Sequence, residues 1–152
     1  MKQVLERLLI GGLTPCFRRF CAAGRACRLT GWKRMLRHAL WKARLAGLGE
    51  GTIIHPWVAI HGPENVRIGA RCSVAEFVHL WGGGGVTIGN DVLIASHVAI
   101  TSITHDKDAP CFRETTVRAP VVIGDNVWIG AGAIILPVSR LGRAALSARG
   151  PW

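Results

Sequence analysis

The residues best suited to proton transfer lie in one polar segment of the chain, residues 101–122. His105 belongs to the cluster TSITHD at the start of this segment. Imidazole has the only side-chain pKa that lies near neutrality without perturbation, so His105 could accept the proton of a substrate hydroxyl as a general base. A loop histidine can equally be a solvated residue without a chemical role. Three carboxylates could each orient the ring, and the sequence does not choose among them: Asp106, Asp108 and Glu114.

The elements that hold this segment are indicated by a six-residue repeat. A branched aliphatic residue recurs at positions 54, 60, 68, 74, 80, 88, 94, 100, 123, 129, 135 and 141. The spacing is six residues except after Ile60, Leu80 and Ile100, where it is eight, eight and twenty-three. Because the exceptions fall at every third step, the extra residues leave the same corner of a three-sided coil. The repeat therefore predicts a triangular prism of short parallel strands with about twenty residues per coil.

Residues one coil apart should stack on neighbouring strands of the prism. The two expected columns are Ile54, Val74 and Ile94, and Ile60, Leu80 and Ile100. A β-sandwich would show apolar residues with a period of two, and that period does not recur in this chain.

This repeat, together with the segment VVIGDNVWIGAGAIILP over residues 121–137, resembles the hexapeptide-repeat acyltransferases. The nearest branch is that of the sugar O-acetyltransferases, which includes maltose and galactoside acetyltransferases and the acetyltransferases of surface-polysaccharide clusters. The resemblance implies a mainly β fold, a left-handed parallel β-helix preceded by N-terminal α-helical segments. The expected parts are a basic helical segment over 1–50, the β-helix over 51–146 with a catalytic loop over 101–122, and an irregular tail over 147–152.

The resemblance also implies an activity. It predicts an acetyl-CoA-dependent O-acetyltransferase that acts on a sugar hydroxyl of a surface-polysaccharide or related saccharide precursor, by direct transfer with His105 as general base. A homotrimer with active sites between the prisms is expected, and no metal. The residues expected to bind the acceptor are Glu76, Trp128 and Asn126, and those expected to bind acetyl-CoA are Ala131, Gly132 and Arg140.

The chain departs from its relatives at two positions of the acceptor site. Glu76 stands where they have an asparagine, and the run Gly82–Gly85 stands where they have a substrate-contacting aspartate. Glu76 could bind a sugar hydroxyl or be an exposed turn charge. The four glycines indicate either the close approach of a ligand or a flexible corner.

Three other functions are considered. A γ-class carbonic anhydrase would need a zinc site of three histidines, and His61, His79 and His97 are eighteen residues apart. Since the coil period there is twenty, these residues should not form one column. The other two alternatives are an N-acetyltransferase acting on an amino sugar and a catalytically impaired β-helix with an assembly or binding role.

Composition and charge limit further which classes of protein and partner are possible. The chain has 152 residues, enough for one domain, and 49% of them are hydrophobic, which excludes a wholly disordered protein. The net charge of +10 is uneven, because residues 1–50 hold eleven Lys or Arg against two acids whereas residues 51–139 hold five against seven. A nucleic-acid partner is therefore not expected. Five cysteines without a C-x-x-C pair fit a reducing cytoplasm rather than a disulfide framework.

The two ends of the chain depart from the repeat. Trp32, Met35, Leu36 and Leu40 recur at helical spacing among basic residues, which predicts a basic amphipathic helix. This helix could cap the prism or lie on an anionic membrane at its cytoplasmic face. Two shorter helical pieces are expected upstream, around residues 4–9 and 17–21. At the other end the repeat dissolves after residue 142, where relatives continue for another coil. Truncation or a shifted reading frame over 147–152 is the expectation there.

Overall fold

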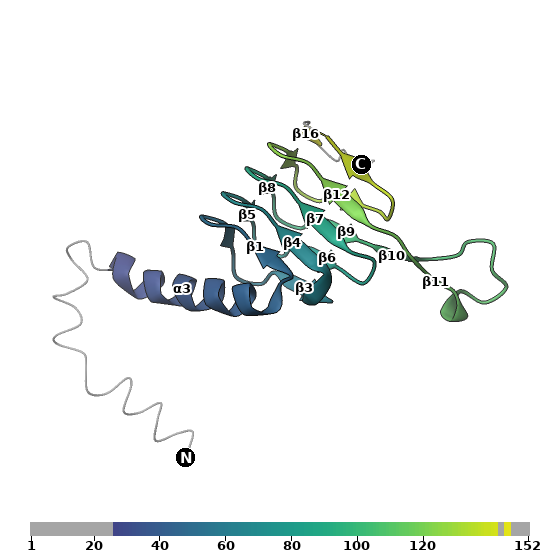
Figure 1. The fold of residues 1–152 in the computed structure, drawn as a ribbon, viewed down its shortest axis with the longest axis horizontal. Coiled ribbons are helices and arrows are strands. Elements are labelled where there is room, and N and C mark those ends of the chain that lie inside the picture. Colours follow the sequence, from purple (N-terminus) through teal and green to yellow (C-terminus); the bar gives the residue numbers. More distant parts are fainter. Residues whose placement is uncertain (1–25, 143–144, 147–152) are drawn as a thin grey trace, which may run out of the picture. The chain divides into compact units, whose positions relative to one another are not determined.

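The computed structural model describes the backbone of residues 26–142 and 145–146. The predicted helical pieces around residues 4–9 and 17–21, and the tail over 147–152, lie outside the described residues. Contacts divide the chain into two units, residues 1–37 and 38–152. The second unit holds all the strands described below (Figure 1).

Short strands form three parallel sheets, named here A, B and C. Sheet A contains β1 (Gly47–Leu48), β4 (Val66–Ile68), β7 (Val86–Ile88), β12 (Val121–Ile123) and β15 (Arg140–Leu141). Sheet B contains β2 (Ile53–Ile54), β5 (Ser73–Val74), β8 (Leu93–Ile94), β13 (Trp128–Ile129) and β16 (Ala145–Leu146). Sheet C contains β3 (Ala59–His61), β6 (His79–Trp81), β9 (Ala99–Thr101) and β14 (Ile134–Ile135). The chain visits the sheets in turn, so each coil adds one strand to each sheet.

The register confirms both predicted columns. The paired residues are Ile54 with Val74 and Val74 with Ile94, then Ile60 with Leu80 and Leu80 with Ile100. All of these side chains are buried. Each buried aliphatic side chain of the columns contributes about 1.5–3 kcal/mol relative to an exposed one. The prediction of a three-sided parallel β-helix is thus confirmed.

The first coil begins earlier than the predicted boundary at residue 51. Gly47 and Leu48 of β1 pair with Arg67 and Ile68 of β4 and so already belong to sheet A. Leu48 lies six residues before Ile54 and so extends the hexad register by one step before the first position counted in the sequence.

Three corners join the sheets, and each is named by the sheets that it connects. The A–B corner comprises residues 49–52, 69–72, 89–92 and 124–127, and the B–C corner comprises residues 55–58, 75–78, 95–98 and 130–133. The C–A corner comprises residues 62–65, 82–85, 102–120 and 136–139. The extra residues thus all leave the prism at the C–A corner, as predicted.

Left-handed backbone turns the chain at the first two corners. The residues with positive φ are Gly51, Arg71, Asp91 and Asn126 at the A–B corner, and Trp57, Phe77, His97 and Gly132 at the B–C corner. This conformation costs about 1–2 kcal/mol for an L-residue, so the surrounding coils must impose it. At the B–C corner the rings of Phe77 and His97 stack, with centroids 5.2 Å apart.

Within the part of the chain that the structure describes, the strands are preceded by helix α3 (Ala26–Arg44). Near its end Trp41 packs against the core, and the next buried side chain is Leu45. The side chains of the predicted apolar stripe are each more than half exposed: Trp32, Met35, Leu36 and Leu40. Trp41 lies nine residues after Trp32, about two and a half helical turns, and therefore on the opposite side of α3. Among the described residues no helix has the length and apolar content needed to cross a bilayer.

Candidate active site

The predicted catalytic loop is a hairpin arm. Its strands β10 (Ile103–His105) and β11 (Thr116–Arg118) are antiparallel and form a two-stranded sheet of their own. A short 3-10 helix, η2 (Phe112–Glu114), lies near the tip. Figure 1 shows the hairpin extending outward from the strands of the prism. Residues 102–119 are called the arm below.

His105 is exposed at the end of β10, and its ring is held by a backbone group. Its Nδ1 lies 3.1 Å from the carbonyl oxygen of Thr115 on the opposite side of the hairpin. A carbonyl can only accept a hydrogen bond, so Nδ1 carries the proton and Nε2 is the basic nitrogen. This is the tautomer that a general base needs. Thr115 escaped the sequence reasoning because any residue type can offer a backbone carbonyl.

The three carboxylates near His105 take no part in this contact. The Asp106 carboxylate accepts a hydrogen bond from the backbone N–H of Asp108, at 3.0 Å. Within the described chain no hydrogen bond joins His105 to Asp106, Asp108 or Glu114, and all three are exposed. The choice among them that the sequence left open therefore stays open.

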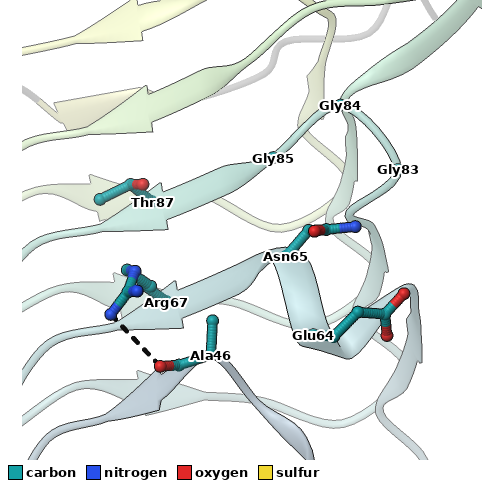
Figure 2. Close-up of a pocket in the computed structure, with 8 residues that line it drawn as sticks. All are labelled: Ala46, Glu64, Asn65, Arg67, Gly83, Gly84, Gly85 and Thr87. Atoms are coloured by element: carbon teal, nitrogen blue, oxygen red, sulfur yellow. Dashed lines mark hydrogen bonds between the residues drawn. The ribbon is translucent and has the colours of Figure 1, made fainter.

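A polar hollow of about 430 Å³ lies at the edge of sheet A beside the C–A corner. Its lining residues are Ala46, Glu64, Asn65, Arg67, Gly83, Gly84, Gly85 and Thr87. Figure 2 shows Arg67 and Thr87 on neighbouring strands and the glycines along the far side. The guanidinium of Arg67 donates to the carbonyl of Ala46 at 3.2 Å. The sequence drew attention only to the glycines here, because Glu64, Asn65 and Arg67 read as ordinary surface residues.

Glu76 lies at the B–C corner, where its carboxylate is 3.0 Å from Nδ1 of His55. A hydrogen bond from its own backbone N–H and a second one from His55 lower the pKa of Glu76 below the usual value. Glu76 is therefore an anion at neutral pH and already has a partner. Ala131 and Gly132, expected to bind acetyl-CoA, lie two coils further along the same corner.

The other expected residues lie on different sides of the prism. Trp128 is half exposed on sheet B beside Leu93, and Asn126 is exposed at the A–B corner. Arg140 is exposed on β15 at the edge of sheet A. None of these positions lies at the C–A corner, where His105 leaves the prism. One copy of the described chain therefore does not gather the expected residues into a single site.

The three histidines weighed as a zinc site do not form a column, as predicted. His61 pairs with Trp81 across sheet C, whereas His79 pairs with Ala59 and Ala99. The rings of His61 and His79 are nevertheless 6.3 Å apart, and His97 lies at the B–C corner. Within residues 26–142, no group of three or more His, Cys, Asp or Glu is placed to hold a metal ion.

Comparison with known proteins finds a family match in the coils on both sides of the arm. The family model described as the hexapeptide repeat of succinyl-transferase matches residues 64–102 and 120–143. The segment between the two matches, residues 103–119, is the arm without its first residue, Ser102. The coils thus carry the family pattern and the arm interrupts it.

Several curated proteins and solved structures are similar to this chain. Galactoside O-acetyltransferase of Lactococcus lactis subsp. lactis is 31% identical over 114 residues, which cover 73% of this chain and 55% of that protein. Nodulation protein L of Rhizobium leguminosarum bv. viciae is 36% identical over 96 residues, covering 62% and 50%. A hexapeptide-repeat-containing acetyltransferase from Vibrio cholerae, crystallised with acetyl coenzyme A, matches with a TM-score of 0.71 at 26% identity. That match covers 85% of this chain and 67% of the other. The chain spans about half the length of the curated relatives that it matches.

Proposed function

Because this chain belongs to the hexapeptide-repeat acetyltransferase family, we propose that it transfers an acetyl group from acetyl-CoA to a saccharide hydroxyl. The observation that carries the proposal is the state of His105, whose Nδ1–H is held by the Thr115 carbonyl so that Nε2 can act as base. The acceptor is a surface-polysaccharide or related saccharide precursor, in keeping with the relatives named galactoside O-acetyltransferase.

The proposed reaction is a direct transfer. Nε2 of His105 removes the hydroxyl proton while the oxygen attacks the thioester carbonyl carbon. The new C–O bond forms, the C–S bond breaks, and the CoA thiolate takes the proton from the imidazolium. A backbone N–H that donates to the developing oxyanion would stabilise the transition state. No acyl-enzyme intermediate arises in this scheme.

We propose that the complete site lies between copies of the chain in a homotrimer. This accounts for two observations: the arm extends from its own prism, and Glu76 and Trp128 lie away from the C–A corner. Exposed apolar side chains on sheets B and C, together with Leu136 at the C–A corner, supply surface for such contacts: Leu93, Trp128 and Ile134. A neighbour's Trp128 or Glu76 would then face the acceptor, and Asn126 would contribute there. Ala131, Gly132 and Arg140 would line the acetyl-CoA site.

The test is product formation by the full chain. Purified protein, acetyl-CoA and a panel of mono- and oligosaccharides are incubated, and acetylated sugar and released CoA are measured together. Equal amounts of both products are expected, from a species whose mass in sedimentation is three times that of one chain. Calorimetric titration of CoA should show one site per subunit. A folded trimer that binds no CoA would contradict the proposal.

We also propose that α3 contacts an anionic membrane surface at its cytoplasmic face. The helix holds six Lys or Arg and no acid, and its exposed apolar stripe lies opposite Trp41, the residue that packs on the core. Apolar area and basic charge both favour binding to anionic lipid, and each basic residue contributes about 1 kcal/mol near the surface.

The membrane proposal is tested by sedimentation with vesicles of anionic or zwitterionic lipid. Binding to the anionic vesicles at low salt, weakened by added salt, is the expected result. The variant Met35→Glu/Leu36→Glu should reduce it strongly, because charges would enter the apolar stripe. Absence of the full chain from the anionic pellet at low salt would refute the proposal.

A further inference from the structure

Both ends of the arm meet at one point of the C–A corner. The arm begins at Ser102 and ends at Ala119, whose backbone N–H donates to the Ser102 carbonyl at 3.0 Å. The arm therefore closes on itself at its base. What holds Ser102 in place consequently determines where the whole hairpin starts.

Ser102 is held by three hydrogen bonds to the preceding coil. Its backbone N–H donates to the carbonyl of Trp81 at 2.9 Å, and its hydroxyl donates to the same carbonyl at 2.5 Å. The hydroxyl also accepts the backbone N–H of Gly84 at 2.8 Å. Ser102 is fully buried, so water cannot replace a bond that is lost. The hydroxyl thus ties the base of the arm to both sides of the preceding turn.

The glycines supply the space that this contact needs. A Cβ added to Gly84 would overlap the Ser102 carbonyl oxygen and would lie 2.7 Å from the backbone nitrogen of Ala119. A Cβ added to Gly83 would overlap the Cδ1 atom of Ile103, the first residue of β10. The Gly84 neighbours are backbone atoms that cannot rotate away. The close approach at Gly83 and Gly84 is therefore made by the arm itself.

The base of the arm is near enough to His105 to control its position. His105 is the third residue after Ser102 along an extended strand, a span of about 10 Å. Thr101 and Ile103 add two hydrogen bonds through the Thr101 hydroxyl, at 2.7 and 3.1 Å. A change in the orientation of the backbone at Ser102 would therefore displace the imidazole of His105.

From this geometry we infer that Ser102 and Gly84 are positioning residues for His105. They hold the arm at the angle that presents Nε2 to the acceptor hydroxyl, and they touch no substrate themselves. The inference rests on the proposed function for its catalytic consequence. The attachment of the arm can be tested independently of catalysis.

The experiment compares Gly84→Ala with Gly47→Ala in the full chain. Gly47 is the matched control, because an added Cβ there meets only the Arg67 side chain at the ordinary contact distance of 3.5 Å. Amide hydrogen exchange measured by mass spectrometry should rise at least about tenfold over residues 103–119 in Gly84→Ala and stay unchanged in Gly47→Ala. In Gly84→Ala, kcat should fall about 100-fold with the KM for acetyl-CoA within about twofold of the parent, since misplacement of about 1 Å costs that much.

A second variant, Ser102→Ala, removes only one oxygen and guards against misfolding of Gly84→Ala. Its kcat should fall about tenfold with the same exchange signature, because the Gly84 N–H loses its buried acceptor. Exchange and kcat equal to those of Gly47→Ala in both variants would overturn the inference. So would faster exchange of the arm without a loss of kcat.

His105→Ala, measured alongside, separates the two proposals. If this variant keeps the parent's activity, the general-base role fails and with it the catalytic consequence for Ser102 and Gly84. The exchange data would still show whether these residues hold the arm.

Discussion

The A–B and C–A corners of the prism both connect one sheet to the next, but they are built differently. The A–B corner is a four-residue turn in each coil, tied by side chains to the coil above: Arg71 binds Asp91 through two nitrogens at 2.7 and 2.6 Å, and Asn90 binds Asp125. The C–A corner has four residues in three coils, 62–65, 82–85 and 136–139, and the long segment 102–120 in the remaining one. It has the glycine run, the polar hollow and the arm with His105. The regular corner serves the register of the coils, and the irregular corner is the place where chemistry can be attached.

The sharpest test of this comparison is His105→Ala. We expect acetyl transfer to fall by about 10²- to 10⁴-fold, the usual contribution of a general base, with an unchanged melting temperature. His105 is exposed on a two-stranded sheet separate from the sheets of the prism, so the fold should not depend on the imidazole. Rate assays and thermal unfolding of the same preparation provide the two readings. Activity within tenfold of the parent would remove His105 from the mechanism.

Gly89→Ala, at the A–B corner, should lower the stability of the fold without lowering activity, the reverse of the result expected for His105→Ala. The added Cβ would lie 2.7 Å from the carbonyl carbon of Gly124, so the stacked coils must shift. We expect a loss of about 1–3 kcal/mol in the free energy of unfolding, with kcat of the folded protein unchanged.

The matched control for this change is Gly142→Ala. Gly142 occupies the equivalent place after β15, and an added Cβ there has no neighbour within 4 Å. Denaturant unfolding of both variants measures the difference. Equal free energies of unfolding for Gly89→Ala and Gly142→Ala would show that the close contact at Gly89 does not limit the stability of the stacked coils.

The smallest effect is expected from Arg71→Ala, and it should depend on pH. The hydrogen bond from Arg71 lowers the pKa of Asp91, so the pair stabilises the fold above the usual carboxyl pKa of about 4. That contribution disappears as the pH falls through the lowered pKa of the folded state. The melting temperatures of parent and variant should therefore differ slightly at pH 7 and converge as the pH falls below the usual carboxyl pKa. A constant difference across this range would show that the ion pair is not its cause.

The prism was predictable because its physical cause is periodic. One side chain in every six residues must point inward, so an aliphatic residue recurs at that spacing whether it is Val, Ile or Leu. The stacking of Val74 on Ile54 could therefore be predicted from the spacing alone. The place of His105 on an excursion from one corner followed from the same counting.

The remaining details depend on groups that leave no mark in the sequence. The Thr115 carbonyl that holds His105 is backbone, and so are the atoms that crowd Gly84. Helical spacing revealed the stripe on α3, but Trp41 on the opposite side makes the contact with the core. Periodicity shows which residues share a face, and it does not show what that face meets.

The closure of the arm at its base has a consequence for how such proteins can diversify. Because the arm leaves at Ser102 and returns to it at Ala119, its length does not enter the register of the strands on either side. A coil can be inserted or deleted only as a whole turn, whereas this excursion can grow, shrink or be exchanged while β7 and β12 stay paired. The segment that carries the proposed base can thus change in length while the scaffold stays constant.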